Sequence, residues 1–433
     1  MKKIVILGAG MTGLSAAYFL QKHGVDFSVY EKEASLGGLC RSLKIDGFTF
    51  DYAERFLRMP DENFKKFILG LMGGNIFPKE LSASIYFKGA HVRFPFQKNL
   101  FDLPKSLRSE CLKSYIRAAK KKQDYKNFAQ WTRASFGEAI AKYFMIPYNK
   151  KIWAYAPAKM SVDWFRGEFL PKHDVKSVKE GAELPPEKRA ENPAQIRWYP
   201  RHGGAQELPK ALAENIDKRF IFYNKQAKRV DLKKRRVFFE DGKSAEYDVL
   251  ITTMPLNELV DIIYQADRQI KTVAGKLKYN SAVCLNFGVD RQDVSDMHWI
   301  YFPEKKFIFS KLYFLRNFSE NSVPKGQSVV SALVTYTKEK PLNRKDIEKK
   351  TLEGIKACGI IRKDEKADFI AMQEIKYAFA IPTIDLSQNR VLIQRFLRSK
   401  NIYSIGRYGN WEYSGMEHAV RAGKNIAEEV ALL

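Results

Sequence analysis

Three glycines and one acidic residue near the start of the chain have the types and the spacing that bind a dinucleotide. Gly8, Gly10 and Gly13 form a Gly-x-Gly-x-x-Gly run, and Glu31 follows 18 residues after Gly13. The first glycine permits a tight turn, the second lets the backbone approach a pyrophosphate, and the third allows a helix to pack closely on a strand. Glu31 lies where a carboxylate can accept hydrogen bonds from both ribose hydroxyls. The set therefore predicts a dinucleotide site.

A strand, a helix and a second strand must position these residues. Residues 4–7 are a continuous apolar run, which is typical of a buried parallel strand. Apolar residues then recur at helical spacing from Leu14 to Leu20, and Gly24 ends the helix before a second strand over residues 25–30. The amino end of such a helix offers N–H groups to an anionic pyrophosphate. Because all the parts come in this order, we prefer a nucleotide site to a glycine loop that serves packing alone.

The segment after Glu31 resembles the FAD proteins of the amine oxidase and protoporphyrinogen oxidase superfamily. It contains a second Gly-Gly turn, an Arg-Ser pair and a short Gly-Phe-x-Phe-Asp strand, and the runs at 247–256 and 402–407 match the same superfamily. The resemblance implies FAD rather than NAD, held by an α/β, Rossmann-like domain to which both chain ends contribute. The cofactor contacts that it implies are Gly8, Gly10, Gly13, Glu31, Gly37, Gly38, Arg41, Val230, Gly406, Arg407, Gly415 and Met416.

Four further runs are similar to UDP-galactopyranose mutases of the eukaryotic type, and they occur in the same order at similar spacings. They are residues 94–99 (FPFQKN), 136–164 (which contain IPYNKKIW), 299–304 (WIYFPE) and 406–413 (GRYGNWEY). The resemblance implies that UDP-galactose or a related nucleotide sugar is isomerised between its pyranose and furanose forms without net redox. In that chemistry the reduced form of FAD is active, and its N5 atom is the nucleophile at the anomeric carbon.

The same resemblance assigns roles to single residues. Phe94, Phe96 and Gln97 would hold the uracil, although core packing is the alternative for a Phe-Pro-Phe run. Asn149 and Trp153 lie four apart on an expected helix, hence on one face, where they either flank the sugar diphosphate or anchor a buried helix. Lys311 stands where the mutases have an arginine. It supplies a point charge rather than the paired hydrogen-bond donors of a guanidinium. The implied catalytic group is Asn149, Trp153, Arg166, Tyr301, Lys311 and Tyr413, with both tyrosines donating to the diphosphate.

The chain departs from the resemblance at three places. The run from Ala53 to Arg55 (Ala-Glu-Arg) replaces the Gly-Gly-His run that usually faces the flavin, which crowds the backbone and brings a charge pair near the ring. Glu168 stands where the mutases have another diphosphate-binding arginine, so Arg166 is the expected substitute. Met416 stands where the family usually has asparagine. These departures bear on which sugar is used and on whether mutase chemistry is retained.

The expected organisation is a discontinuous FAD-binding domain, a mainly helical insertion, and a substrate domain built on an antiparallel β-sheet. Their bounds are 1–60 with 195–260 and 395–433, then 61–194, then 261–394. Within the insertion, residues 171–193 are rich in Lys, Glu and Pro and predict a mobile surface loop. Helices are expected at 63–71, 107–122 and 128–144, and substrate-domain strands at 281–289, 299–302, 311–314 and 329–336.

Composition narrows the class of protein. The formal net charge is +25, but the basic residues are spread along the chain and no basic stretch is interleaved with aromatics, so we expect no nucleic-acid partner. A generally Lys-rich surface, phosphate-bearing small molecules and peripheral contact with an anionic membrane remain as explanations of the charge. The mean hydropathy is −0.37 and no run of about 18 apolar residues occurs, so we expect no membrane span. Four cysteines without CxxC spacing indicate reduced thiols in a cytoplasmic protein and no metal site.

Two other functions stay open from the sequence. The first is an FAD-dependent oxidase or desaturase of the same superfamily that acts on an amine or a polyene. The second is a flavin-binding protein without catalysis, in which the Ala53–Arg55 segment has removed productive contact with the flavin. The sequence shows no second dinucleotide motif, so NAD(P)H as the reductant would have to bind in the substrate cleft. The identity of the sugar and the oligomeric state are not determined by the sequence.

Overall fold

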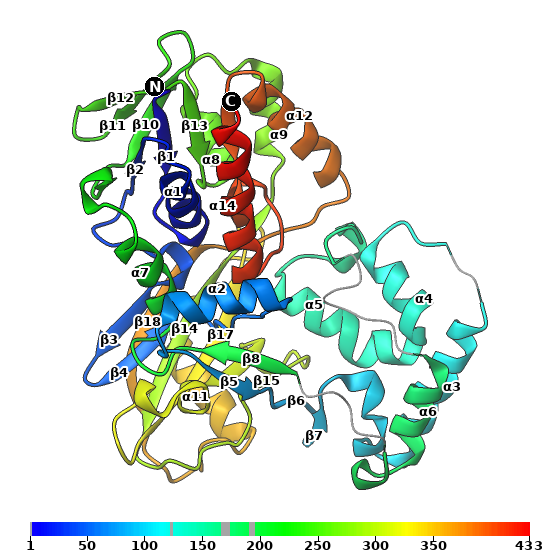
Figure 1. The fold of residues 1–433 in the computed structure, drawn as a ribbon. Coiled ribbons are helices and arrows are strands. Elements are labelled where there is room, and N and C mark those ends of the chain that lie inside the picture. The colour runs from blue at the N-terminus through cyan, green and yellow to red at the C-terminus, as the bar shows by residue number, and fades with distance from the viewer. Residues whose placement is uncertain (1, 122–123, 166–173, 190–194) are drawn as a thin grey trace.

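The computed structural model describes residues 2–121, 124–165, 174–189 and 195–433 (Figure 1). Its first sheet is parallel and has the strand order β19-β13-β1-β2-β9. The strands are β1 (Ile4–Leu7), β2 (Phe27–Tyr30), β9 (Ile221–Phe222), β13 (Val249–Thr252) and β19 (Ile402–Ser404). Both chain ends contribute to this sheet, and in Figure 1 the helices α1 and α14, from the two ends, lie side by side. The mixed α/β fold expected from the sequence is confirmed.

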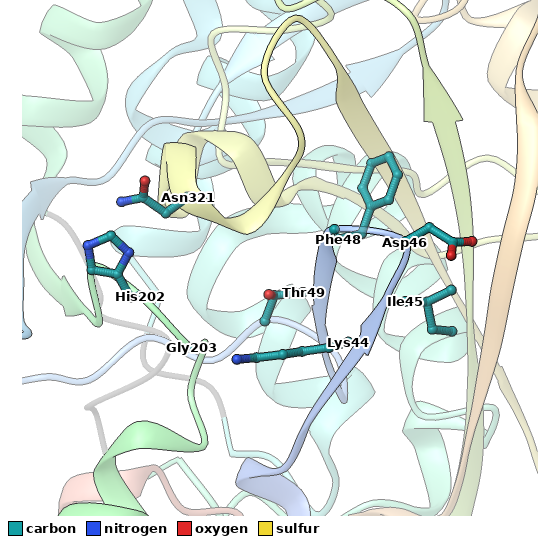
Figure 2. Close-up of a pocket in the computed structure, with 9 residues that line it drawn as sticks. Lys44, Ile45, Asp46, Phe48, Thr49, His202, Gly203 and Asn321 are labelled. Atoms are coloured by element: carbon teal, nitrogen blue, oxygen red, sulfur yellow. The ribbon is translucent and has the colours of Figure 1, made fainter.

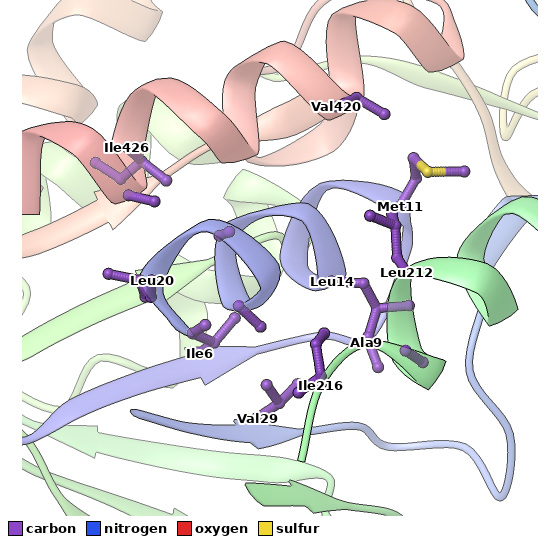
Figure 3. Packing of buried hydrophobic residues seen from close by; sticks show 14 of the residues in the cluster. Ile6, Ala9, Met11, Leu14, Leu20, Val29, Leu212, Ile216, Val420 and Ile426 are labelled. Carbon is purple, nitrogen blue, oxygen red and sulfur yellow. The ribbon is translucent and has the colours of Figure 1, made fainter. Parts of the chain in front are cut away.

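The central strand β1 is buried on both faces because helices cover one face and a second layer covers the other. Ile4 and Ile6 pack in the cluster that contains α1 (Met11–Lys22), α7 (Glu207–Glu214) and α14 (Met416–Ala431). Figure 3 shows α1 between this strand and α14, with Leu14 and Val420 among the contacting side chains. The alternate residues Val5 and Leu7 face the other cluster, as the two-residue period of a strand requires. The elements of that second layer are β10 (Ala227–Asp231), β11 (Arg236–Phe239), β12 (Ser244–Glu246), α8 (Leu256–Ile262), α9 (Arg268–Gly275) and α12 (Leu386–Arg398).

A seven-stranded sheet forms the second large unit, in the order β18-β14-β17-β16-β15-β6-β7. Its strands are β6 (Ala83–Phe87), β7 (Ala90–Arg93), β14 (Tyr279–Val289), β15 (Trp299–Tyr301), β16 (Lys311–Phe314), β17 (Ser328–Tyr336) and β18 (Asp368–Ala380). All pairs are antiparallel except β15 with β6. The expected strands are present, but β6 and β7 come from a stretch that the sequence indicated as largely helical. One face of the sheet packs on α11 (Ile347–Ala357), and the other faces the helical part.

The helical part contains the expected helices and one that the sequence did not predict. Its elements are α2 (Glu62–Met72), α3 (Lys105–Ala119), α4 (Phe128–Ile140), a π-turn (Ala141–Met145), α5 (Ile146–Ile152) and α6 (Val175–Glu183). The mobile loop expected at 171–193 is wrong for 175–183, where Asp174 caps α6 by accepting from the Ser177 N–H. Val178 and Ala182 are buried, so one face of α6 is held by the core. Residues 171–173 and 190–193 of that loop lie outside the described residues.

Two short pairs of strands connect the large units. The hairpin β3 (Ser42–Ile45) and β4 (Phe48–Asp51) follows the glycine-rich segment, and β5 (Phe77–Glu80) pairs with β8 (Ile196–Tyr199). The buried Asp51 carboxylate joins them, since it accepts from the Tyr199 hydroxyl at 2.7 Å and from the Ala205 N–H at 3.0 Å. Burial raises the pKa of the Asp51 carboxyl. In the described part of the chain, no helix combines the length and apolar character needed to cross a bilayer.

Candidate active site

The amino end of α1 is built as an anion-binding turn. Gly8 has a φ of +105°, and its N–H donates to the Tyr30 carbonyl at 2.8 Å, so the chain turns sharply where β1 ends. Gly10 precedes α1 and has no side chain to occupy the first N–H groups of the helix. It lies against the second glycine turn, because the Gly37 N–H donates to the Ala9 carbonyl at 2.8 Å. Free helix N–H groups beside two glycine turns suit a pyrophosphate.

Gly13 and Glu31 complete the dinucleotide site. A Cβ at Gly13 would lie 1.9 Å from the Gly8 carbonyl oxygen, so only glycine lets α1 pack this closely on β1. The Glu31 side chain is 6% exposed, and its two oxygens accept from the N–H groups of Ala9 (2.7 Å) and Glu33 (3.0 Å). The carboxylate is thus held at the end of β2, and each oxygen keeps lone pairs for a ribose. These residues fit the nucleotide half of FAD.

The other expected cofactor contacts come from three separate segments. Arg41 donates through Nε to the Gly38 carbonyl at 3.1 Å, which places it on the second glycine turn. Gly415 and Met416 form the amino end of α14. Val230 is fully buried in β10, and its backbone pairs with Ile263 in an isolated bridge. The whole of Val230 is buried and its side chain is apolar, so it offers a cofactor no side-chain chemistry.

Gly406 and Arg407 lie in α13 (Gly406–Gly409), directly after β19. Gly406 has a φ of +77°, and a Cβ there would lie 2.6 Å from Thr12 Oγ1, so α13 approaches the amino end of α1. The Arg407 guanidinium donates to the carbonyls of Ser414 (2.6 Å) and Ala378 (3.1 Å). Its Nε is buried and has no partner among the described residues, which leaves a donor for a bound group. The donor set fits a flavin cofactor.

Aromatic side chains form one wall beside Arg407. The guanidinium lies 5.1 Å from the ring centroid of Tyr413, whose ring in turn lies 5.7 Å from that of Trp153 and 5.4 Å from that of Trp164. Phe379 of β18 stacks on Tyr413 at 5.9 Å. Trp153 and Tyr413, two of the expected catalytic residues, are therefore together. Arg166 lies outside the described residues, as does Glu168.

Tyr301 and Lys311 lie on the neighbouring strands β15 and β16, where their backbones pair directly. Burial raises the pKa of the Tyr301 hydroxyl, so this group stays protonated and can donate a hydrogen bond at neutral pH. Tyr301 and Tyr413 pack against the same hydrophobic cluster, which contains Trp153. Tyr148 of α5 packs edge-on against Tyr301, with ring centroids 5.0 Å apart. The two walls are thus parts of one packed aromatic region.

Lys311 is not a free cation. Its ammonium group forms an ion pair with the Glu54 carboxylate, and its side chain is only 9% exposed. Burial acts to lower the pKa of Lys311, but the negative charge of Glu54 outweighs it and holds the pKa above the ordinary value. Burial acts to raise the pKa of Glu54, and the charge of Lys311 outweighs that effect and holds the pKa low. The Ala53–Arg55 run was expected to bring a charge pair near the flavin ring. In the structure, Glu54 of this run forms its ion pair with Lys311.

Asn149 and Trp153 share one face of the chain at the end of α5, as expected, and they bind each other. Trp153 Nε1 donates to Asn149 Oδ1 at 3.2 Å, and Asn149 Nδ2 donates to the Met145 carbonyl at 2.8 Å. Both ends of the Asn149 amide thus have a protein partner. Lys151, on the opposite side, donates to three carbonyls of residues 302–309 and anchors α5 to the seven-stranded sheet. Asn149 positions Trp153 whether or not it also contacts a ligand.

The three residues expected to hold uracil have different surroundings. Phe96 is fully buried and stacks on Phe144 with ring centroids 5.2 Å apart, so its ring belongs to the core. Phe94 is half-buried, and its ring lies 5.2 Å from that of Tyr301. Gln97 is 5% exposed in the short helical turn that follows. The structure therefore brings Phe94 to the Tyr301 wall and places Phe96 behind it.

Three residues beside this site have strained backbones. Ala53 (φ +65°), Ala154 (φ +47°) and Trp411 (φ +49°) lie in the left-handed region, which side chains other than glycine rarely adopt. They precede Glu54, follow Trp153, and stand two residues before Tyr413. Such strain persists where the surroundings hold a functional group in place.

Replacement of Ala53 by glycine should remove this strain. A left-handed alanine costs about 1–2 kcal/mol. Part of the stability gained by removing this strain is lost, because glycine has more conformational entropy than alanine in the unfolded chain. We expect Ala53→Gly to raise the free energy of unfolding by about 0.5–1 kcal/mol in urea denaturation. Ala211→Gly, within the helix α7, is the control and should lower it by about 1 kcal/mol. A destabilised Ala53→Gly protein would show that the turn is not strained.

Two pockets lie away from the group around Lys311. Figure 2 shows the first, about 390 Å³ in volume, between the β3–β4 hairpin, His202 and Asn321. The second, about 400 Å³, is lined by Lys159, Lys276 and Lys278 together with a few residues near Thr383. Both are open hollows that no expected site residue lines, whereas the site described above has buried charges and the uncapped amino end of α1.

Sequence reasoning missed three residues of the site. Tyr148 lies inside the IPYNKKIW run, where its aromatic side chain was visible but had no assigned role. Phe379 belongs to β18, a strand that was not expected. Trp299 places its ring centroid 4.9 Å from the Lys311 ammonium, and the WIYFPE run contained it. No cluster of metal-ligating side chains occurs among the residues that the structure describes.

Comparison with known proteins gives one family and one close structural likeness. The family model described as flavin containing amine oxidoreductase matches residues 11–431. The crystal structure of reduced UDP-galactopyranose mutase superposes with a TM-score of 0.93 and 26% identity, covering 99% of this chain and 95% of that one. Wild-type putrescine oxidase bound to putrescine superposes with a TM-score of 0.67 and 16% identity, covering 100% of this chain and 99% of that one. The second likeness concerns the fold alone.

Among curated proteins, the 4,4'-diapophytoene desaturase (4,4'-diaponeurosporene-forming) of Staphylococcus aureus strain RF122 / ET3-1 is 44% identical over 59 residues. This match covers 14% of the chain and 12% of the desaturase. The shared segment is thus a small part of the relative's length, and it says little about the rest of the chain.

Proposed function

Because the chain belongs to the flavin-containing amine oxidoreductase family, we propose that it is an FAD-dependent nucleotide-sugar mutase. It would interconvert the pyranose and furanose forms of UDP-galactose or a related sugar nucleotide, as a mutase of the eukaryotic type. The observation that carries the proposal is that Tyr301 and Tyr413 pack on one aromatic cluster, with Lys311 paired to Tyr301 across the strands and the Arg407 guanidinium over the Tyr413 ring. The extent of the likeness to the reduced mutase, over 99% of this chain, supports it.

The domain organisation follows from the same proposal. Residues 1–60, 195–260 and 395–433 would bind FAD, and residues 61–194 and 261–394 would enclose the substrate. When bound and reduced, FAD supplies a nucleophilic nitrogen for the anomeric carbon. Gly10 and Gly13 leave room for its pyrophosphate, while Glu31 accepts from its ribose. A cytoplasmic location would supply reduced NAD(P)H as the class of reductant.

The residues around Lys311 would stabilise the negative charge of the departing nucleotide. Negative charge grows on the diphosphate as its bond to the sugar breaks, and cations and hydrogen-bond donors fixed in a buried site stabilise it. Tyr301 stays protonated because burial raises its pKa, so its hydroxyl can donate to a phosphate oxygen. Lys311 supplies the positive charge on the neighbouring strand. Phe94 offers an aromatic face for the uracil, with Gln97 close behind it for the amide edge of the base.

The decisive experiment gives the reduced holoprotein a panel of UDP-sugars and separates the products by chromatography. We expect UDP-galactofuranose to be converted to UDP-galactopyranose only when the flavin is reduced, since the oxidised flavin has no nucleophilic N5. The oxidised holoprotein is the control. Absence of any ring-isomerised product, together with absence of UDP binding, would contradict the proposal.

The Glu54–Lys311 ion pair favours a second candidate, an FAD-dependent oxidase or desaturase. A lysine that is already neutralised attracts a diphosphate less than a free one does, and the aromatic wall of Trp153, Trp164 and Phe379 suits an apolar substrate. This candidate predicts oxygen consumption or flavin bleaching with amines or polyenes, and indifference to UDP. The same protein preparation distinguishes the two functions.

A further inference from the structure

The Lys311 ammonium group is surrounded before any ligand binds. Its Nζ lies 4.9 Å from the ring centroids of both Trp299 and Tyr301, and the Glu54 carboxylate pairs with it from the segment after β4. The two aromatic faces and the carboxylate leave little of the charge unopposed. An anionic ligand can gain the full attraction of this cation only if the carboxylate gives it up.

Among the described residues, the cation that pairs with the Glu54 carboxylate is Lys311, and the charge of the neighbouring Arg55 also helps to hold the pKa of Glu54 low. The Oε2 atom of Glu54 is buried and lacks a hydrogen-bond partner in the described part of the chain. The neighbouring Arg55 directs its guanidinium to backbone carbonyls, with Nε donating to Leu39 at 3.2 Å and Nη1 to the Glu54 carbonyl at 3.5 Å. The other titratable groups that act on Glu54, or on which it acts, are Tyr148, Tyr301, Tyr313 and Cys284. None of these can carry a positive charge.

We infer that Glu54 competes with the diphosphate of the substrate for Lys311, so that binding of an anionic nucleotide is coupled to uptake of a proton by Glu54. The inference rests on the proposed function, because it requires an anionic nucleotide at this site. The proton comes from solvent and is held on a Glu54 oxygen, while the ammonium of Lys311 passes from the carboxylate to the phosphate. No covalent bond other than that O–H changes.

Proton uptake is coupled to nucleotide binding because an ionised Glu54 would be unfavourable in the bound protein. If Glu54 stayed ionised, a buried carboxylate would lie unpaired next to a diphosphate, and burial and like charge both disfavour that state. The pKa of Glu54 is held low by Lys311 without ligand and must rise when the ligand takes the lysine. Between these two pKa values the bound state holds more protons than the free state. Nucleotide affinity therefore falls as pH rises through that window, by up to about tenfold per pH unit.

The test measures UDP binding to the oxidised holoprotein by titration calorimetry. Titrations at one pH in two buffers of different ionisation enthalpy count the protons exchanged. We expect uptake of about one proton per UDP near the middle of the window, and an affinity that falls with rising pH. In Glu54→Gln we expect proton uptake to fall by about one per UDP, so that only the ionisation of the UDP terminal phosphate remains, and binding about tenfold tighter or more at high pH.

A matched control uses Glu258→Gln, which also removes a carboxylate paired with a lysine, Lys376, but on the second layer of the cofactor-binding half. It should leave proton uptake and affinity unchanged. UDP binding without proton uptake in the wild-type protein would overturn the inference and leave the proposed function standing. Failure of UDP to bind at all would overturn both. If Glu54→Gln does not fold, the proton count of the wild-type protein decides alone.

Discussion

Lys311→Met should lower the free energy of unfolding by about 3 kcal/mol at neutral pH, because it leaves the Glu54 carboxylate, whose side chain is only 22% exposed, without its paired cation. Chemical denaturation of the holoprotein measures the loss. Without Lys311, burial is the largest remaining influence on Glu54 and raises its folded-state pKa above the unfolded value, against the smaller opposing effect of Arg55. The folded protein then binds a proton more tightly than the unfolded chain does. The penalty should therefore be small at acidic pH and grow as pH rises through the range between the two pKa values.

The double variant Lys311→Met/Glu54→Gln is the control for this prediction. It removes both charges, so it should recover most of the stability lost in the single variant. A loss in Lys311→Met of no more than about 1 kcal/mol would mean that the pair behaves as an exposed ion pair. That result would contradict the burial on which the description of the site depends.

Gly13→Ala should abolish flavin binding. The added Cβ would lie 1.9 Å from the Gly8 carbonyl oxygen, a backbone atom that cannot move aside as a flexible side chain would. Helix α1 must therefore shift from β1 and carry its N–H groups away from the pyrophosphate. We expect bound FAD, measured by absorbance after denaturation, to fall at least about tenfold, which corresponds to about 1.4 kcal/mol of binding energy. The free energy of unfolding should fall by about 3 kcal/mol, as for severe overpacking.

Gly70→Ala is the matched control, because Gly70 lies within α2 and a Cβ there would meet nothing within 4 Å. Alanine is the better helix former, so this variant should keep its flavin and gain about 1 kcal/mol of stability. A Gly13→Ala protein that retained stoichiometric flavin would show that the turn between β1 and α1 does not bind the cofactor.

The cofactor-binding half was predictable because its signals are local. The apolar run of β1, the glycines and Glu31 lie within 31 residues, and short-range periodicity identifies each element. The strands β14, β15, β16 and β17 were predictable for the same reason. The strand β18 was not predicted, although exposed Glu374 and Lys376 alternate with buried neighbours there, because the alternation covers only a short part of its 13 residues. The helix α6 was hidden by its Lys-rich surface, although Asp174 before it is a capping residue.

The site was predictable as a set of residues but not as a set of contacts. Glu54 and Lys311 are 257 residues apart, so no sequence pattern pairs them. The absence of the Gly-Gly-His run indicated only that the segment around Glu54 differs from the family. Phe94 and Phe96 belong to one short motif, and nothing in it tells which ring lies against Tyr301 and which lies in the core. These distinctions depend on how the seven-stranded sheet packs on the helical part, and such packing is set by tertiary contacts rather than by local preference.

The parallel sheet has a consequence for how the protein is made in the cell. Its strands β1 and β2 leave the ribosome early, but β19 and the helix α14 that covers α1 follow only after the whole seven-stranded sheet has been made. Until they emerge, the apolar surface of α1 stays uncovered, and chaperones are the natural partners for such an intermediate. The amino end of α14 and Arg407 arrive equally late. Flavin can therefore stabilise only a polypeptide that extends through α14, and chains terminated before it would remain unliganded and sensitive to proteases.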